Sequence, residues 1–364
     1  MTITVKAAVC REFGAPLVVE DVTLASPGPG EILIRLKACG ICHSDITFAE
    51  GGWGGDLPMV LGHEAAGIVQ AVGSGVSRYQ VGDRVIATLV RACHQCHYCK
   101  RDEEFMCEEV FPLDENTPLQ DLDGAPLTQA MRTGAFAEAI VVEQSQVSPL
   151  PDGVSFEVGS LVACGVLTGF GAVTNTANMP AGAHAVVVGC GGVGLNTVQG
   201  ARHAGAASIT AVDLDDGKLL AAKQYGATHI VNPQCGNAAE VIQAASDGRW
   251  ADYVFVTVGS GAAIEAATGY IGKGGCVVIV GMPHADTMNN YNPASFAGWS
   301  QKLIGSKMGS AKINRDVPQL FSLYQAGVLK LDDMISGRFR LEEINEAIAS
   351  TKSGKALRNV IVFD

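Results

Sequence analysis

The pattern of hydrophobic and polar positions divides the chain into a β-rich first part and a later part in which strands and helices alternate. In residues 2–87 the apolar runs are short and alternate with polar positions. Ile32, Ile34 and Leu36 are one example of this alternation. Glycine and proline interrupt the runs, as at residues 26–30. Short strands joined by tight turns favour a β-barrel for this part.

The later part begins with an apolar run at residues 184–188, which leads into a glycine-rich turn and a helical pattern. Further strand-like runs follow, with helical spacing between them, at residues 208–212, 253–258, 276–280 and 303–308. Strands that alternate with helices in this way predict an open parallel sheet. The chain then continues with two helical patterns and a last strand, at residues 317–326, 341–352 and 359–362.

The region between these two parts changes pattern twice. Residues 114–132 are polar and rich in turn-forming residues, which predicts an insertion loop. Residues 136–142 return to a strand pattern. Helical spacing begins near Phe156 and includes Cys164.

Composition is consistent with a globular protein of two domains, because the chain has 364 residues, of which 48% are hydrophobic and 17% charged. The formal charge of −12 is spread without acidic blocks, which argues against nucleic acid or an anionic membrane as a partner. The first residues are too short and too alternating for a signal peptide, and we find no apolar run of about 18 residues. We therefore expect a cytoplasmic protein.

Eleven cysteines in a long chain without an export signal indicate metal ligands or buried thiols rather than disulfides. We expect the following to pack in the core: Cys10, Cys39, Cys190, Cys235 and Cys276.

Cys42 and His63 offer a thiolate and an imidazole, two ligand types that zinc favours. Asp45 and Glu64 lie beside them and can hold ligand N–H groups or balance the charge of an ion. Cys164 is a third candidate ligand. A buried cysteine and a surface histidine are the alternative interpretation, but the combination favours a metal site.

A second cluster has the spacing C-x2-C-x2-C-x7-C, at Cys93, Cys96, Cys99 and Cys107. Four thiolates close a tetrahedral shell around zinc, so this site is predicted to be structural, with metal binding supplying folding energy to a polar loop. Reduced thiols without metal are the alternative. His94 and His97 lie between the cysteines and are expected to face solvent.

The glycine-rich turn after residues 184–188 has the form G-x-G-x-x-G, with Gly189, Gly191, Gly192, Val193 and Gly194. A strand precedes it, a helix follows, and the next strand ends at Asp213. Such glycines let a pyrophosphate approach the helix N-terminus, and the acid binds ribose hydroxyls. The pattern is typical of a Rossmann domain that binds a dinucleotide.

The chain resembles the zinc-containing alcohol dehydrogenases of the medium-chain dehydrogenase/reductase superfamily. The resemblance covers essentially the whole chain and is carried by motifs that occur in order, namely G-I-C-H-S-D, G-H-E-A-A-G, the four-cysteine cluster, C-G-V-L-T-G-F-G and G-C-G-G-V-G. It implies an α/β protein with two domains. These are a GroES-like β-barrel catalytic domain of residues 1–165 and 309–364, and a Rossmann doubly wound parallel-sheet domain of residues 166–308.

The resemblance implies reversible oxidation of an alcohol to an aldehyde or ketone by hydride transfer to NAD, with two zinc ions per chain. Cys42, His63 and Cys164 would hold a catalytic zinc that leaves one position for the substrate oxygen. Zinc lowers the pKa of bound water from about 15.7 to about 7, and we expect a similar effect on an alcohol. Glu64 and Asp45 are assigned to the surroundings of the ion. We also expect a homodimer or homotetramer.

The cofactor contacts implied by the resemblance are Thr168 and Val193 at the nicotinamide, Asp213 and Lys218 at the adenosine ribose, and Arg358 and His43 at the pyrophosphate. Simple packing for Val193, a solvated helix face for Lys218 and a surface ion pair for Arg358 are the alternatives. Because a carboxylate at Asp213 repels the 2′-phosphate of NADP, we predict a preference for NAD.

Ser44 is expected to start a proton relay, but the family's histidine is replaced here by Thr47. A hydroxyl near neutral pH does not hold a proton as imidazole does, so ribose and then water are expected to carry the proton on. Trp53, in the loop between Cys42 and His63, is a candidate wall of the alcohol pocket. A partly buried surface aromatic is the alternative.

Three other functions are kept as alternatives. Polyol dehydrogenases use a glutamate beside the zinc histidine, but lack a cysteine where this chain has Cys164. Glutathione-dependent formaldehyde dehydrogenases carry an arginine that binds the substrate carboxylate, shortly after the fourth structural cysteine. This chain has Phe111 there, with acidic residues just before it, which argues against an anionic glutathione adduct as substrate. The third alternative is a non-catalytic protein that binds NAD and keeps only the structural zinc. The intact set of Cys42, His63 and Cys164 argues against it.

Overall fold

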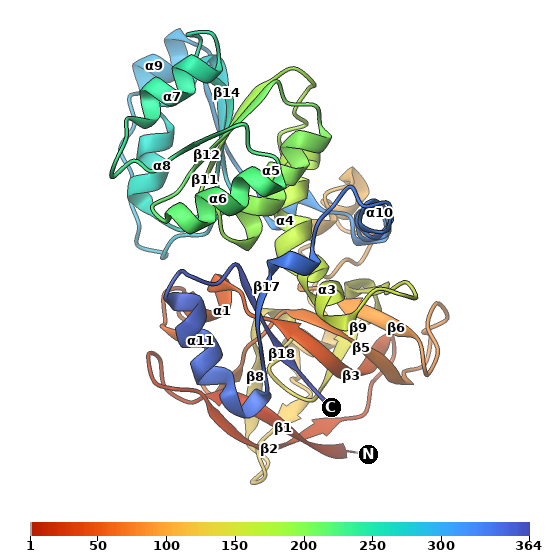
Figure 1. Ribbon diagram of the computed structural model, residues 1–364. Helices are drawn as coiled ribbons and strands as arrows, with labels where there is room; N and C mark the ends of the chain where they lie inside the picture. The colour runs from red at the N-terminus through yellow and green to blue at the C-terminus, as the bar shows by residue number, and fades with distance from the viewer. Residues whose placement is uncertain (1) are drawn as a thin grey trace. The chain divides into compact units, whose positions relative to one another are not determined.

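The computed structural model describes residues 2–364, which form two compact units (Figure 1). The first unit consists of the chain up to Cys164 together with Lys312–Gly327 and Leu331–Asp364. The second consists of Gly165–Ala311 and Val328–Lys330. The predicted domain bounds of 1–165, 309–364 and 166–308 lie close to these breaks, but they do not contain the short return of Val328–Lys330 to the second unit.

Short strands of the first unit close into a barrel, as the alternating pattern predicts. The strand order is β1 (Thr2–Cys10), β2 (Val18–Ala25), β7 (Leu119–Gln120), β8 (Pro126–Gln129) and β4 (Met59–Val60). The prediction of an insertion loop at residues 114–132 is wrong in part, because this stretch supplies β7 and β8. Strands of two to four residues are too short to show an alternation that sequence analysis can detect.

A second sheet of this unit is centred on β3 (Glu31–Gly40). On one side of β3 follow β5 (Glu64–Val72), β6 (Arg84–Ala87) and β10 (Val147–Pro149); on the other follow β18 (Arg358–Val362) and β17 (Ile335–Phe339), and β9 (Ala139–Glu143) also pairs with β3. Gly40 at the end of β3 pairs with Glu64 and with Val360. Three distant parts of the chain therefore meet beside Cys42.

Several helices complete the first unit: α1 (His43–Ala49), α2 (Pro112–Glu115), α3 (Phe156–Leu161), α10 (Ile313–Gln325) and α11 (Ile344–Lys352). The predicted helices at 317–326 and 341–352 correspond to α10 and α11. Helix α10 begins four residues earlier than its predicted start, while residues 341–343 form a separate 3₁₀ turn. Strand β17 was not expected, because its residues are half-buried or exposed and show no apolar run.

The second unit is built on a parallel sheet, which confirms the predicted doubly wound class. The order is β13 (His229–Val231), β12 (Ser208–Val212), β11 (His184–Val188), β14 (Ala251–Val256), β15 (Ile271–Ile279) and β16 (Lys302–Gly305). The helices between the strands are α5 (Gly192–His203), α6 (Asp216–Tyr225), α7 (Ala238–Ala245), α8 (Gly261–Ala267) and α9 (Pro293–Gly298) (Figure 1). Central strands are buried and rich in valine, as Val186, Val254 and Val277 illustrate.

A continuous helical stretch, Phe156–Thr176, contains the break between the units. After α3 it passes through a π-helical segment (Val162–Val166), α4 (Leu167–Gly171) and a second π-helical segment (Ala172–Thr176). By length and hydropathy this stretch is a candidate membrane span among the described residues, so the expectation that the chain has no apolar run of about 18 residues is wrong. However, 89% of its apolar window is buried inside the protein. Such burial is what a core helix shows.

Candidate metal and cofactor sites

Four potential ligand atoms of Cys42, His63, Glu64 and Cys164 lie within 4.8 Å of one another, and all four residues are buried. Cys42 caps the N-terminus of α1, while His63 and Glu64 stand at the entry to β5. Cys164 comes from the π-helical segment, a type of local widening that is frequent at functional sites. Two thiols, an imidazole and a carboxylate in a buried cluster are a donor set that fits zinc.

Asp45 organises this cluster from the first turn of α1, where it is 1% exposed. Its carboxylate accepts hydrogen bonds from the backbone N–H groups of Cys42 (3.1 Å) and Gly62 (2.9 Å). The same carboxylate lies 3.0 Å from Nδ1 of His63. A proton held on Nδ1 leaves Nε2 as the ligand atom, and Nε2 lies 3.3 Å from Sγ of Cys164. Asp45 thus fixes both the orientation and the tautomer of the imidazole.

Arg358 and Glu64 form a buried ion pair beside the thiols, with 3.1 Å between Nη2 and Oε1. Arg358 also donates from Nη1 to the backbone carbonyl of Ile41 at 3.0 Å. Burial raises the pKa of Glu64 to about 7, although the guanidinium opposes this rise. Arg358 is buried, and its predicted contact with a pyrophosphate stays a prediction.

The two thiols of the cluster influence each other. Hydrogen bonding with Cys164 lowers the pKa of the Cys42 thiol well below its ordinary value. The same interaction raises the pKa of Cys164 well above its ordinary value. For His63, burial lowers the pKa, but the charge and hydrogen bond of Asp45 outweigh burial and raise it. The side chains of the cluster therefore favour a thiolate at Cys42 and a positive charge on His63 even without a metal ion.

Three other predicted residues lie in or just after α1. Ser44 places Oγ 3.5 Å from Sγ of Cys42, at the edge of the cluster. His43 is exposed. Trp53 is half-buried in the turn after α1, and its ring centroid lies 6.0 Å from that of Phe48.

The four-cysteine cluster also converges, with its ligand atoms within 4.8 Å of one another. The sulfur atoms of Cys93 and Cys99 are 4.0 Å apart, and those of Cys96 and Cys107 are 3.9 Å apart. A tetrahedral zinc site with Zn–S bonds of about 2.3 Å requires separations of about 3.8 Å, so the arrangement fits. The backbone N–H groups of Cys93, Cys96 and Cys99 donate to sulfur atoms within the cluster.

The histidines of this loop face away from the sulfur atoms. Nδ1 of His94 lies 3.3 Å from Oε1 of Glu104, and the His94 side chain is 52% exposed. The ring of His97 packs edge-on against Tyr98.

The glycine motif forms the turn between β11 and α5. Gly189 has φ +91°, and a Cβ at Gly194 would come within 1.8 Å of the Gly189 carbonyl oxygen, so neither position accommodates a side chain. A Cβ at Gly191 would meet no atom within 4 Å. Gly191 caps α5 without a side-chain hydrogen bond to the helix N-terminus. Space and helix N–H groups are thus present where a pyrophosphate would bind.

Asp213 stands directly behind this turn. Its carboxylate accepts from the backbone N–H of Cys190 at 2.6 Å and from that of Asp215 at 2.9 Å. Lys218 is half-buried in the first turn of α6. In α4, Thr168 is 8% exposed and lies 3.6 Å from the sulfur of Met308. The cofactor roles of Val193, Thr168 and Lys218 stay predictions.

Comparison with known proteins decides the family. Residues 28–152 match the family model described as the alcohol dehydrogenase GroES-like domain, and residues 192–326 match the one described as zinc-binding dehydrogenase. The chain belongs to the zinc-containing alcohol dehydrogenases. It is therefore an oxidoreductase that acts on alcohols or aldehydes, as its motifs predict.

Individual members of this family are similar over nearly the whole chain. The NDMA-dependent alcohol dehydrogenase of Amycolatopsis methanolica is 35% identical, and the match covers 98% of each chain. The S-(hydroxymethyl)glutathione dehydrogenase of Paracoccus denitrificans is 34% identical, covering 98% of this chain and 99% of the relative. The crystal structure of benzyl alcohol dehydrogenase from Acinetobacter calcoaceticus is 27% identical, with a TM-score of 0.92 and full coverage of both chains.

Two features of this family member differ from the sequence predictions or were missed by them. Cys235 is exposed, so its assignment to the core is wrong; it lies in the turn after β13, where no apolar run indicated burial. The pairing of Arg358 with Glu64 was not predicted. A lone arginine far along the sequence gives no signal of its partner until β18 is paired with β3.

Proposed function

We propose that the protein oxidises alcohols reversibly to aldehydes or ketones with NAD as hydride acceptor and two zinc ions per chain. The observation that carries this proposal is the buried set of Cys42, His63 and Cys164, which Asp45 orients. The four-cysteine cluster supports a second, closed zinc site that takes no part in the chemistry.

When bound, zinc supplies Lewis acidity that lowers the pKa of an alcohol, and NAD supplies the hydride acceptor. Cys42, His63 and Cys164 would hold the ion, and Asp45 keeps the proton of His63 on Nδ1. The hydroxyl of Ser44 takes the proton of the alcohol and passes it on. The pair of Glu64 and Arg358 balances charge within the buried cluster.

The choice of NAD rests on the surroundings of the glycine turn. The carboxylate of Asp213 is held in place by two backbone N–H groups, and Asp215 and Asp216 follow it on the surface. A 2′-phosphate beside these acids would be repelled, which costs several kcal/mol. We expect kcat/KM to be clearly higher with NAD than with NADP and the gap to narrow in Asp213→Gly. Equal efficiency with both cofactors in the parent would contradict the proposal.

The substrate is proposed to be an uncharged alcohol rather than a glutathione adduct, despite the name of the Paracoccus relative. The Phe111 ring lies over the guanidinium of Arg91, 5.4 Å from its carbon to the ring centroid, and Asp114 pairs with that guanidinium at 2.9 Å. The guanidinium of Arg91 is therefore already engaged, and Glu108 and Glu109 add negative charge. The name of the benzyl alcohol dehydrogenase supports including aromatic alcohols among candidate substrates.

A single set of measurements tests this function. Elemental analysis should find two zinc ions per chain, and absorbance at 340 nm should rise when NAD is mixed with a panel of simple, aromatic and polyol alcohols. Because one relative is named NDMA-dependent, each assay should be run with and without NDMA. One zinc ion and no turnover on any alcohol would favour a protein that only binds NAD.

A homodimer is proposed to form through the edge strand of the second unit. Strand β16 has no neighbour on its outer side among the described residues, and Leu303 and Trp299 are exposed beside it. An edge strand with exposed apolar side chains is a template for pairing. Sedimentation velocity should give a dimer or tetramer, and Leu303→Lys should shift it toward monomer.

A further inference from the structure

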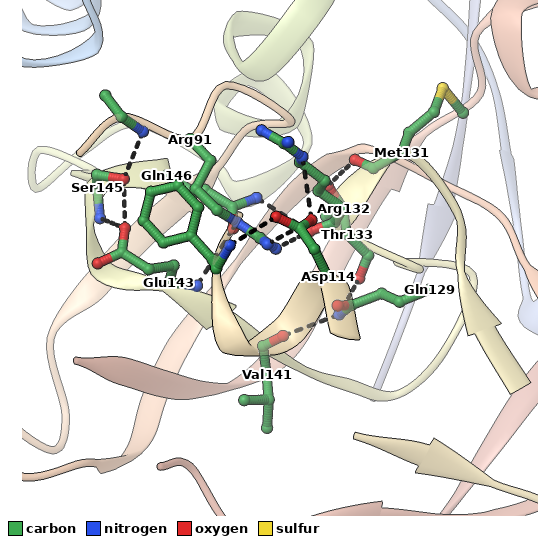
Figure 2. A network of polar contacts seen from close by, with 12 residues as sticks. Arg91, Asp114, Gln129, Met131, Arg132, Thr133, Val141, Glu143, Ser145 and Gln146 are labelled. Carbon is green, nitrogen blue, oxygen red and sulfur yellow. Dashed lines mark hydrogen bonds and ion pairs between the residues drawn. The ribbon is translucent and has the colours of Figure 1, made fainter. Parts of the chain in front are cut away.

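Arg91 carries a buried charge outside the sites described above. It lies two positions before Cys93 and is only 1% exposed. Its guanidinium donates from Nε to Oε1 of Gln146 at 2.8 Å, from Nη1 to Oδ1 of Asp114 at 2.9 Å and from Nη2 to the carbonyl of Arg132 at 3.3 Å (Figure 2). A buried guanidinium with partners on three sides has a single favourable position. Arg91, Asp114, Arg132 and Gln146 are called the Arg91 network.

The network closes the base of the four-cysteine loop. Arg91 precedes the loop, and Asp114 follows it in α2. The two oxygens of Asp114 have different tasks, because Oδ2 accepts from the backbone N–H of Phe111 at 3.0 Å while Oδ1 binds Arg91. Both ends of the loop are therefore held to one carboxylate.

The same network holds a strained turn. Met131 and Arg132 have φ values of +49° and +59°, a left-handed conformation that is unfavourable for residues other than glycine. The carbonyl of Arg132 accepts from Arg91 and also from Nε2 of Gln146 at 3.0 Å, and Nε of Arg132 lies 3.2 Å from Asp114 (Figure 2). Such a conformation persists only where its surroundings enforce it.

From this turn the chain runs directly to the backbone beside His63. Ala135 donates to the carbonyl of Gly62 at 2.8 Å, and Phe136 donates to that of Leu61 at 2.7 Å. Gly62 has φ +94°, and a Cβ there would come within 2.6 Å of the Phe136 nitrogen, so the two segments are in close contact. The N–H of Gly62 in turn donates to the carboxylate of Asp45 that orients His63.

We propose that Arg91 is a positioning residue that couples the four-cysteine loop to the His63 ligand, so that retention of zinc at the site of His63 depends on an ordered four-cysteine loop. The path consists of the Arg91 network, the turn at Met131 and Arg132, and the contact of residues 135–136 with residues 61–62. Packed elements of this kind transmit a displacement because neither side has space to absorb it. The inference rests on the two zinc sites of the proposed function.

The test compares zinc release from the two sites in the holoenzyme. Asp114→Asn keeps an oxygen for the N–H of Phe111 but loses the negative charge that pairs with Arg91. Arg91→Lys keeps the positive charge but loses the planar guanidinium, whose N–H groups reach three partners at once. The matched controls are Asp121→Asn, which changes a carboxylate that binds only local backbone N–H groups, and Arg101→Lys, which changes an exposed pair with Glu103. Val254→Ala serves as a control for general loss of stability, because Val254 is buried in the parallel sheet of the second unit and the path lies in the first.

Zinc release to a coloured chelator should be at least tenfold faster from the four-cysteine site in Asp114→Asn and Arg91→Lys, and at least threefold faster from the site of His63. With cobalt in the site of His63, the absorption bands of the folded variants should shift, whereas Val254→Ala should retain the parent spectrum. Acceleration at the four-cysteine site alone, or a spectrum equal to that of the parent, would overturn the coupling. Fewer than two zinc ions in the parent would overturn both the proposed stoichiometry and the coupling.

Discussion

The two cysteine-containing clusters of the first unit are assembled in opposite ways. The four-cysteine cluster comes from one short stretch of chain, and its own apolar core contains little beyond Ala92 and Phe111. The cluster around Cys42 draws ligands from α1, the start of β5 and the helix at Cys164, all enclosed by the main core of the barrel. The first site needs metal to hold its loop together, whereas the second is ordered by the fold and imposes that order on the metal.

Electrostatics sharpens this difference. Around Cys42 the fold supplies Asp45, Glu64 and Arg358 as buried charged groups, so the site is strongly polarised. Around the four cysteines the polar partners are mostly backbone N–H groups, which suit a closed shell of thiolates. Loss of a ligand should therefore affect turnover at one site and stability at the other.

Cys164→Ser should produce the largest effect on activity. Without this thiolate the buried site is expected to lose zinc or its geometry, and kcat should fall by at least about three orders of magnitude because the alcohol proton is no longer acidified. The melting temperature should stay close to that of the parent, since the barrel core orders the site. Stopped-flow assays with NAD and circular dichroism melts measure the two quantities. A large fall in the melting temperature of Cys164→Ser would contradict the expectation that this site affects activity rather than stability.

Cys99→Ser tests the other side of the comparison. Opening the closed shell should weaken the binding of structural zinc. In small zinc domains this binding supplies about 10–16 kcal/mol of apparent folding free energy, and a larger protein is expected to lose a part of that amount. We expect the melting temperature to fall by about 10 °C or more, while any protein that remains folded should still turn over alcohol but release zinc from the site of His63 faster than the parent. Ser145→Ala, at a hydroxyl that binds the N–H of Ala92 beside the loop, is a milder control. Stability equal to that of the parent would mean that the cluster holds no structural metal.

Residue type and spacing predicted the four-cysteine cluster. The set of Cys42, His63 and Cys164 was predicted from residue type together with the family resemblance, because Cys164 lies far from the other two in the sequence. The Arg91 network and the partner of Glu64 were not predictable in this way. Arg91 meets Asp114, Arg132 and Gln146 only after strands distant in the sequence have paired, and none of these residues belongs to a motif.

The fold follows the same division. The parallel sheet was predictable because its strands are continuous apolar runs between helices, as at residues 184–188 and 208–212. Strands β7 and β8 were assigned to a loop, because they owe their existence to neighbours in the barrel rather than to their own pattern.

Ser44→Ala and Thr47→Val address the proton path within the catalytic cluster. Ser44 lies 3.5 Å from Sγ of Cys42, whereas Thr47 is further along α1 where the family has a histidine. Turnover should fall about 10²-fold in Ser44→Ala, within the usual range for a lost general acid–base group, and change little in Thr47→Val. Added small amines should raise the turnover of the parent, because they supply the missing base. A large loss in Thr47→Val, or indifference to Ser44→Ala, would show that the proton leaves by another route.

Trp53→Ala should give the smallest effect and the one most specific to substrate shape. Trp53 is half-buried in the turn after α1, with its ring centroid 6.0 Å from that of Phe48, and α1 starts from the candidate zinc ligand Cys42. Removing the indole should enlarge the pocket, so the ratio of kcat/KM for a bulky aromatic alcohol to that for ethanol should rise by about an order of magnitude, since even one methylene in a pocket changes discrimination by about 1–3 kcal/mol. Phe13→Ala is a useful control, because Phe13 packs under Gly51 of the same turn and the change loosens the loop without altering its tip. If both variants shift the ratio equally, the effect comes from loop mobility; if neither does, Trp53 lies outside the pocket. Zinc content and melting temperature should stay at the parent values in Trp53→Ala, which would separate control of substrate shape from metal binding within the same cluster.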